Sequence, residues 1–168
     1  MLPALVPLDR RALRIGHCWP QRVNVLIENP KGSAIRRVYD HHRQVLIASG
    51  KLAPVPFDYG LIPETEVDPD GDELDAFLWP AARVRTGHLC QATPLATLLL
   101  DDGDHKVVAT LGGRTQVPAA VRRRAEEWLA PWHGIVGWLE RPQTLRLIEE
   151  AHRRYLSRRR AERGRGRP

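Results

Sequence analysis

The chain has 168 residues, of which 42% are hydrophobic, so we expect one globular domain that buries its own core. Its two cysteines, Cys18 and Cys90, are far apart and lack CxxC spacing, which argues against zinc or redox motifs and favours the reducing cytoplasm. No apolar run approaches the roughly 18 residues of a membrane span. Apolar residues precede the N-terminal arginines, which is the reverse of a signal peptide. We therefore expect neither a membrane span nor a signal peptide.

The net charge of +6 is concentrated at the C-terminus, where residues 153–168 carry eight arginines and one glutamate. Such a segment could contact RNA or an anionic lipid through phosphate groups. No interleaved aromatic residues or nucleic-acid motif accompany the charge, so we favour a solvated helix end that continues into a disordered basic tail at 158–168. The single domain then spans residues 1–157, and its charge is close to neutral.

The first two thirds of the chain predict short strands. Residues 23–28 are rich in β-branched side chains and predict a strand, and residues 35–39 and 44–48 predict a hairpin. The prolines that follow exclude a helix from residues 54–63. Further short strands are expected at 76–79, 82–85, 93–100 and 106–111.

The pattern changes after residue 113. Pro118 suits the first position of a helix, and we expect a helix over the residues that follow it. A second helix is expected from near Pro142, where Leu145 and Ile148 stand near helical spacing. Many short strands followed by two helices predict an α+β protein, with a small barrel or curled sheet flanked by the helices.

Acidic residues gather at two short turns. Asp70, Asp72 and Asp75 have the spacing DxDxxD. Converging carboxylates repel one another unless a cation lies between them, and an all-oxygen site favours Mg²⁺ or Mn²⁺. The second turn, residues 101–104, contains three aspartates and leads to Lys106, which could act as a point charge on phosphate oxygens. Each turn alone is typical of a solvated loop, whereas the two together also suit a metal-bound phosphate site.

Four stretches of the sequence together resemble the soluble family I inorganic pyrophosphatases. Residues 70–75 (DGDELD) match the family signature of Asp, a small or polar residue, Asp, then Asp, Pro or Glu, an apolar residue and Asp. Residues 27–33 (IENPKGS) resemble its IEIPKGS stretch, residues 56–63 its YPxNYGFIP segment, and residues 101–106 its acidic loop ending in Asp-x-Lys. The resemblance covers roughly residues 23–155 and implies a small, closed, OB-like β-barrel with two helices packed outside.

The resemblance also implies an enzyme that hydrolyses a diphosphate bond with Mg²⁺, or alternatively Mn²⁺, and commonly forms a homo-oligomer. The default small-molecule substrate is inorganic pyrophosphate. Bound metals would lower the pKa of a water and clamp the phosphate oxygens. Because this acidic loop is shorter than is usual in the family, Asp102 is an alternative to Asp101 as a ligand. The carboxylates that match metal-facing positions are Glu28, Asp70, Asp75, Asp101 and Asp104.

Four further residues match catalytic positions of the family. Asp72 matches the residue that takes the proton from the attacking water. Tyr59 and Lys106 match positions that contact phosphate, and Arg36 replaces a phosphate-binding lysine. Without the resemblance, Tyr59 would be interpreted as a core aromatic residue whose hydroxyl needs a partner.

The substrate-binding positions depart from the family pattern more than the acidic ones do. Val38 stands in place of a glutamate, and Val55 stands in place of a tyrosine. A strand arginine of the family aligns with Ile47, unless a gap brings Arg43 to its place. The family's late Tyr-Lys pair, which grips a phosphate, aligns with the two remaining predicted substrate-binding residues, Trp132 and His133.

These departures leave three interpretations open. In the first, which we favour, the chain hydrolyses inorganic pyrophosphate and tolerates the losses. In the second, the same chemistry acts on an organic diphosphate ester, for which Val55 and Trp132 would make a larger and more apolar pocket. In the third, the chain binds metal or phosphate without catalysis. The third ranks last, because a decayed enzyme is expected to lose its mutually repelling carboxylates first.

Overall fold

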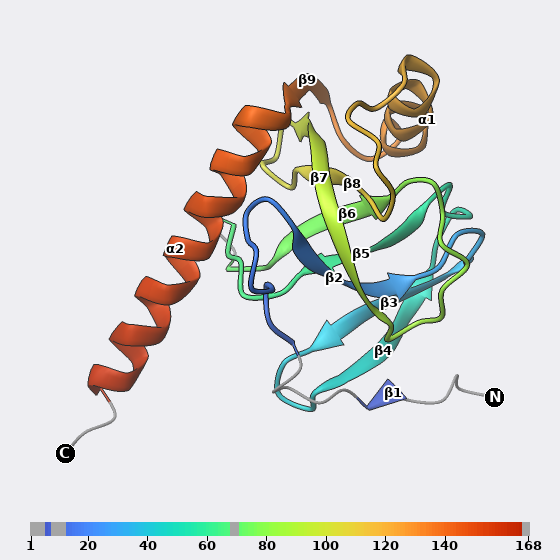
Figure 1. The fold of residues 1–168 in the computed structure, drawn as a ribbon. Coiled ribbons are helices and arrows are strands. Elements are labelled where there is room, and N and C mark those ends of the chain that lie inside the picture. The colour runs from blue at the N-terminus through green and yellow to red at the C-terminus, as the bar shows by residue number, and fades with distance from the viewer. Residues whose placement is uncertain (1–5, 8–12, 68–70, 166–168) are drawn as a thin grey trace.

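Strands fill most of the first two thirds of the chain, and the two helices come later (Figure 1). The computed structural model describes residues 6–7, 13–67 and 71–165. The strands in these residues are β1 (Val6–Pro7), β2 (Val23–Asn29), β3 (Ile35–Asp40), β4 (Val45–Lys51), β5 (Asp58–Ile62), β6 (Leu74–Leu78), β7 (Leu89–Leu100), β8 (Lys106–Thr110) and β9 (Ile135–Glu140). The helices are α1 (Ala119–Leu129) and α2 (Arg141–Arg165).

Five strands close into a small barrel. Because β2 pairs with both β5 and β7, the order β2-β5-β6-β8-β7 returns to its start. The pair β6–β8 is parallel, whereas its neighbours in the ring are antiparallel. Between β2 and β5, a Cβ atom on Gly60 would lie 1.8 Å from the carbonyl oxygen of Leu26, so this close approach requires glycine. The predicted closed barrel with two outer helices is therefore confirmed.

Each helix packs on a different part of the core. α2 contributes Ile148 and Ala151 to one cluster of buried residues, and α1 contributes Ala125 and Leu129 to another that surrounds Phe77. Figure 1 shows α2 and α1 on different sides of the strands. Burying a large apolar side chain contributes about 1.5–3 kcal/mol. The apolar residues of each helix therefore stabilise its packing against the barrel.

Most of the predicted elements are present, with small shifts at their ends. The strand predicted at 82–85 is wrong, because the chain is irregular there. The Ala82 amide donates to the buried carboxylate of Asp58 at 2.6 Å, and Arg83 has a φ of 52°, which no strand accommodates. Three observed strands are absent from the prediction, namely the two-residue β1, β5 within the proline-rich passage and β9 between the two helices.

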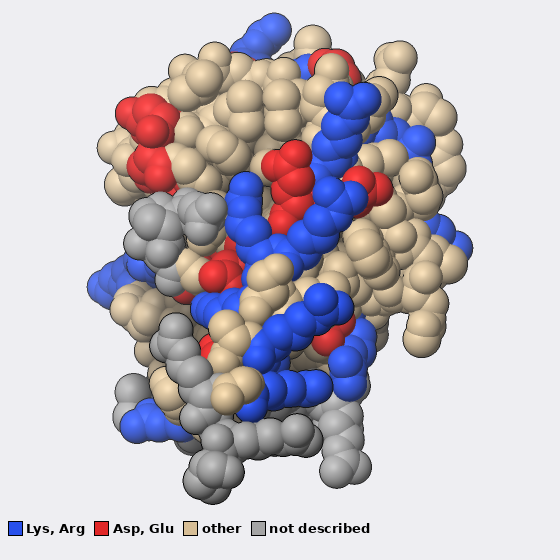
Figure 2. Space-filling view, turned by 90° about the vertical axis from the view of Figure 1, so that its left-hand side faces the viewer, with Lys and Arg blue, Asp and Glu red and all other residues tan. Residues whose placement is uncertain are grey.

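α2 is longer than the sequence indicates. It continues to Arg165, so residues 158–165, expected in a disordered tail, are helical. Ion pairs support this end: Glu162 lies 3.8 Å from Arg158 and 3.7 Å from Arg159. Figure 2 shows that basic side chains on this face of the molecule are interspersed with acidic ones. No helix in the described part of the chain combines the length and the apolar character that a membrane span requires.

Candidate active site

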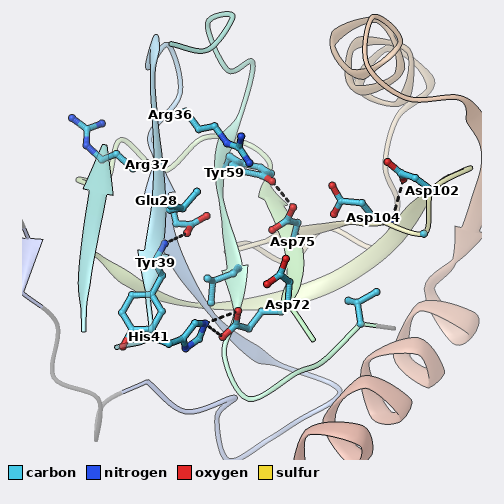
Figure 3. Close-up of a pocket in the computed structure, with 15 residues that line it drawn as sticks. Glu28, Arg36, Arg37, Tyr39, His41, Tyr59, Asp72, Asp75, Asp102 and Asp104 are labelled. Atoms are coloured by element: carbon cyan, nitrogen blue, oxygen red, sulfur yellow. Dashed lines mark hydrogen bonds and ion pairs between the residues drawn. The ribbon is translucent and has the colours of Figure 1, made fainter. Parts of the chain in front are cut away.

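A pocket of about 380 Å³ opens between β3, the connection from β5 to β6, and the turn from β7 to β8 (Figure 3). Lys106 does not line the pocket but lies behind Asp75 and Asp104, which its Nζ atom contacts, and we call these three residues the base of the pocket. Asp70 lies outside the described residues. The predicted site residues that line the pocket are Glu28, Arg36, Tyr59, Asp72, Asp75 and Asp104.

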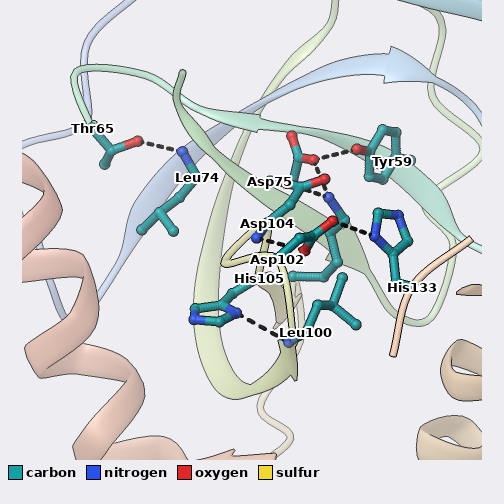
Figure 4. A network of polar contacts seen from close by, with 10 residues as sticks. Tyr59, Thr65, Leu74, Asp75, Leu100, Asp102, Asp104, His105 and His133 are labelled. Carbon is teal, nitrogen blue, oxygen red and sulfur yellow. Dashed lines mark hydrogen bonds and ion pairs between the residues drawn. The ribbon is translucent and has the colours of Figure 1, made fainter. Parts of the chain in front are cut away.

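At the base of the pocket, a buried cation lies between two carboxylates. Figure 4 shows the contact between Asp75 and Tyr59 in this cluster. Lys106 Nζ lies 2.5 Å from Asp75 Oδ2 and 2.6 Å from Asp104 Oδ1, and the Lys106 side chain is 2% exposed. The Tyr59 hydroxyl donates a hydrogen bond to the same oxygen of Asp75. The sheet produces this arrangement, because Asp75 is opposite Lys106 in the β6–β8 pair, and Tyr59 is opposite Phe77, two residues further along β6 on the same face.

Burial and charge together determine the protonation of this cluster. Burial raises the pKa of Asp75, although the charge of Lys106 acts in the opposite direction. Burial alone would lower the pKa of Lys106, but the attraction of Asp75 and Asp104 outweighs it, and that pKa is raised. Burial, followed by the charge of Asp75, raises the pKa of Tyr59 well above its usual value. Lys106 is therefore a permanent cation, and the Tyr59 hydroxyl keeps its proton.

Glu28 forms the opposite wall of the pocket. It is buried, and its Oε1 atom accepts a hydrogen bond of 2.9 Å from the Tyr39 amide. Burial and then the charge of Asp75 raise the pKa of Glu28 well above its ordinary value of 4.5. Glu28 and Asp75 both line the pocket, so two carboxylates share the same space.

The rim of the pocket contains residues that the sequence analysis missed. Figure 3 shows Arg36 directed toward Tyr59, whereas Arg37 points away from the cavity. His41 Nε2 lies 3.0 Å from Glu73 Oε1. No local signal could identify this pair, because 32 residues separate its members. The contact forms only because the β3–β4 hairpin lies next to the connection from β5 to β6. The missed lining residues with polar or charged side chains are Arg37, Tyr39, His41 and Glu73, and Leu61, Val67 and Gly103 also line the pocket.

The three aspartates of the second acidic turn, residues 101–104, do not all face the pocket. Asp102 and Asp104 line the pocket. Asp101 instead accepts a hydrogen bond of 2.9 Å from the Gly134 amide through Oδ1. A Cβ atom on Gly134 would lie 2.4 Å from Asp101 Oδ2, so glycine is needed for this contact. Of the two alternative assignments, Asp102 rather than Asp101 is the residue that faces the pocket.

Trp132 and His133 lie beside the pocket and are not among the residues that line it. His133 Nδ1 is 2.7 Å from Asp102 Oδ2. Trp132 is 54% exposed and packs edge-on against Trp128, with ring centroids 5.6 Å apart. Trp128 in turn packs against Tyr59 at 6.2 Å. Trp132 therefore reaches the site only through other aromatic rings, and His133 reaches it through Asp102.

The pocket fits a hard divalent cation by its chemistry. Its acidic residues supply oxygen ligands, and the repulsion between Glu28 and Asp75 is one that a cation would relieve. Among residues 13–67 and 71–165, no group of three or more His, Cys, Asp or Glu side chains is arranged to hold a metal ion. Mg²⁺ commonly keeps several waters and binds through one or two carboxylates plus substrate phosphates, so an incomplete protein cage is no obstacle.

The profile of the family described as inorganic pyrophosphatase matches residues 25–156, which is most of the chain. The chain belongs to this family. The inorganic pyrophosphatase of Saccharolobus solfataricus is 30% identical over 144 residues, covering 71% of this chain and 83% of that protein. The crystal structure of the inorganic pyrophosphatase from Thermus thermophilus shares the fold, with a TM-score of 0.78 at 24% identity over 85% of this chain and 96% of that one. The family predicted from the four motifs is therefore confirmed.

Val55, which departs from the inorganic pyrophosphatase pattern, and Arg43, which a gap would bring to the family's arginine position, are both absent from the pocket lining. Val55 is 1% exposed and belongs to the core. Arg43 lies in the β3–β4 turn, where its side chain is 71% exposed and stands 3.8 Å from Asp40. A gap that brings Arg43 to the family's arginine position would therefore not restore that arginine to the pocket. Val38, by contrast, does line it.

Proposed function

We infer that the chain is a metal-dependent hydrolase that converts inorganic pyrophosphate to two phosphates. The observation that carries this inference is the base of the pocket, where buried Lys106 joins Asp75 and Asp104 in a member of the inorganic pyrophosphatase family. A buried ammonium group attracts a phosphate, and the surrounding carboxylates attract a divalent cation. Such a pocket suits a substrate that is a phosphate–metal complex.

We propose Mg²⁺ as the metal, with Mn²⁺ as the alternative. When bound, such ions lower the pKa of a water and neutralise phosphate oxygens. Both hydrogen bonds of Asp75 to described side chains use Oδ2, which leaves Oδ1 for a metal. Asp101 is not part of this proposal, because its carboxylate binds the Gly134 amide. The proposed metal-facing residues are Glu28, Asp70, Asp75, Asp102 and Asp104.

The remaining site residues would act directly on substrate and water. Lys106 would bind the phosphate nearest the base of the pocket as a point charge. Tyr59 donates its single hydroxyl proton to Asp75 in this structure and would redirect it to that phosphate when substrate binds. Arg36, directed across the pocket from β3, would bind the second phosphate (Figure 3). Asp72, an exposed carboxylate on the rim, would accept the proton of the attacking water.

The alternative interpretations are less favoured. An organic diphosphate would need an apolar pocket, but neither Val55 nor Trp132 is among the residues that line it. Binding without catalysis is less favoured because the chain belongs to the inorganic pyrophosphatase family and the relatives it matches are named inorganic pyrophosphatases. Inorganic pyrophosphate therefore remains the proposed substrate.

We also propose that the protein is a cytoplasmic homo-oligomer. The support for an oligomer is exposed apolar surface at and near β9, where Val136 is 63% and Trp132 is 54% exposed. The support for the cytoplasm is that Cys18 and Cys90 are both free thiols. Light scattering of the wild type and of Val136→Asp measures the molar mass, and a wild-type mass equal to one chain would contradict the oligomer.

Phosphate release from inorganic pyrophosphate, measured in EDTA and then in millimolar Mg²⁺, tests the proposed function. We expect release only with Mg²⁺, and a rise in melting temperature with Mg²⁺ because the ion binds the native state. Arg153→Ala, on the exposed face of α2, is the control and should keep the activity. A folded protein that releases no phosphate with Mg²⁺ or Mn²⁺ would contradict the proposal.

A further inference from the structure

α2 holds the segment that connects β5 to β6, residues 63–73, which we call the acidic loop. The structure describes this loop at 63–67 and 71–73. The Glu66 amide donates a hydrogen bond of 3.0 Å to the Ala151 carbonyl. His152 Nδ1 lies 2.6 Å from the carbonyl oxygen of Glu64. Both contacts fix the first half of the loop to the middle of α2.

A third contact comes from Arg158, beyond the domain boundary that the sequence indicates. Arg158 Nε lies 2.9 Å from Glu66 Oε2, and Arg158 Nη1 donates a hydrogen bond of 3.5 Å to the carbonyl oxygen of Gly71. Glu66 is 14% exposed, and its Oε2 atom is buried without a hydrogen bond of regular geometry among the described residues. The buried charge of Glu66 therefore depends on the ion pair with Arg158.

Gly71 makes this approach possible. Its φ of 75° is in the left-handed region, and a Cβ atom there would lie 2.7 Å from Arg158 Nη1. Gly71 directly precedes Asp72, whose carbonyl oxygen accepts a hydrogen bond of 2.8 Å from the Val67 amide. Arg158 thus contacts both described halves of the acidic loop, next to the residue predicted to accept the proton.

We propose that Arg158 is a positioning residue for the active site, and that the C-terminal end of α2 is therefore required for full metal affinity. In the sequence, Gly71 stands between the proposed metal ligand Asp70 and Asp72, so Arg158, by neutralising Glu66 and holding Gly71, would restrict this part of the acidic loop before a cation arrives. A site ordered in advance loses less conformational freedom on binding. The inference rests on the proposed function only for its effect on hydrolysis, because metal affinity and loop order are measured without substrate.

Mg²⁺ titration calorimetry of EDTA-treated protein tests this proposal with Arg158→Ala and Arg158→Lys. Arg160→Ala is the matched control, because Arg160 lies on the same end of α2, is exposed, and makes no ion pair within the described residues. We expect Arg158→Ala to weaken Mg²⁺ binding by about 10–100-fold, the usual range for side chains that orient metal ligands. Arg158→Lys should fall between Arg158→Ala and the wild type, and Arg160→Ala should match the wild type.

Amide hydrogen exchange distinguishes a local loosening of the acidic loop from a general loss of stability. Amides of residues 65–67 and 71–73 should exchange faster in Arg158→Ala, while the amides of β8 should not. If Arg158→Ala does not fold, the comparison is made in the Glu66→Gln background, which removes the buried charge. There Arg158→Ala should still bind Mg²⁺ more weakly than Glu66→Gln alone, because the contact with Gly71 is lost.

The outcomes separate the two proposals. Equal Mg²⁺ affinity and equal loop exchange in Arg158→Ala and the wild type would overturn the positioning role, even if the protein hydrolyses pyrophosphate. A wild type that binds Mg²⁺ with an Arg158-dependent affinity but releases no phosphate would overturn the proposed function alone. A wild type that binds no Mg²⁺ would overturn both.

Discussion

The base of the pocket and the substrate-binding positions above it are built in different ways. At the base, Asp75 and Lys106 are opposite each other on paired strands, and the lysine is 2% exposed. Above it, Arg36 projects from an exposed position on β3, and His133 reaches the pocket only through Asp102. The sheet therefore determines the geometry of the base, whereas long surface side chains determine the geometry above it.

This difference explains where the sequence departs from the family pattern. Losing one member of the base would leave a buried charge unpaired, which is strongly destabilising. Losing an exposed contact costs much less, because an exposed ion pair contributes about 0–1 kcal/mol. The base can therefore change little, while positions such as Val38 and Trp132 can differ from the family without loss of the fold.

Lys106→Met removes the cation at the base and should produce the largest change in stability. Removing one partner of a buried ion pair costs about 3–5 kcal/mol, so we expect the free energy of unfolding in EDTA to fall by about this amount. Mg²⁺ should recover more stability in this variant than in the wild type, because it supplies positive charge beside Asp75. Urea denaturation measures both effects, with Lys51→Met as the exposed control. A loss below about 1 kcal/mol, typical of exposed pairs, would contradict the account.

Asp72→Asn and Asp75→Asn separate proton transfer from metal binding. Asp72→Asn should lower kcat by at least about 100-fold, as expected for the loss of a general base, while Mg²⁺ affinity stays near that of the wild type. Asp75→Asn should weaken Mg²⁺ binding itself. If calorimetry shows that both variants bind Mg²⁺ like the wild type, the assigned roles are wrong.

Arg36→Ala probes the substrate-binding positions, with Arg43→Ala as its matched control. Arg36 lines the pocket, whereas Arg43 is 71% exposed in the hairpin turn. A charge-assisted hydrogen bond contributes about 1.5–3 kcal/mol, so Arg36→Ala should lower kcat/KM for pyrophosphate about 10–100-fold. Arg43→Ala should leave kcat/KM nearly unchanged. Equal losses in the two variants would contradict a specific contact between Arg36 and the phosphate.

Glu28→Gln should change how stability depends on pH. Folding raises the pKa of Glu28 above its ordinary value of 4.5, so above that pH the unfolded chain loses its proton before the native state does. This group therefore disfavours the native state increasingly as the pH rises through the interval between the two pKa values. In EDTA, the wild type and Glu28→Gln should be similar in stability below pH 4.5. Glu28→Gln should be the more stable protein at neutral pH. Chemical denaturation at several pH values measures this, and a variant that is less stable at neutral pH would refute it.

The sequence predicted the barrel because its strands and turns carry local signals that agree with the family motifs. β5 was harder to recognise, since prolines precede and follow it, although the strand itself contains none. The strand expected at 82–85 is wrong because a distant carboxylate, Asp58, accepts the Ala82 amide. Such a contact has no signature in the local residue pattern.

Most site residues could likewise be predicted from the sequence, because they belong to local motifs. Residues 72–75 and 101–106 lie on short segments whose spacing is visible in the chain. The choice between Asp101 and Asp102 depended on Gly134, which is 33 residues away. The contact between Arg158 and Glu66 likewise requires α2 to lie across the acidic loop. Tertiary contacts of this kind cannot be derived from periodicity or motif spacing.

The central claim is that an intact base supports hydrolysis of inorganic pyrophosphate even though the surrounding phosphate contacts are fewer. The direct test is kcat/KM with Mg²⁺ for inorganic pyrophosphate, measured beside a nucleoside diphosphate and a sugar diphosphate. We expect pyrophosphate to be the best of the three substrates, with a kcat/KM well below the diffusion ceiling of about 10⁸–10⁹ M⁻¹s⁻¹. Faster cleavage of either ester, or no phosphate release from pyrophosphate by the Mg²⁺-bound protein, would contradict the account.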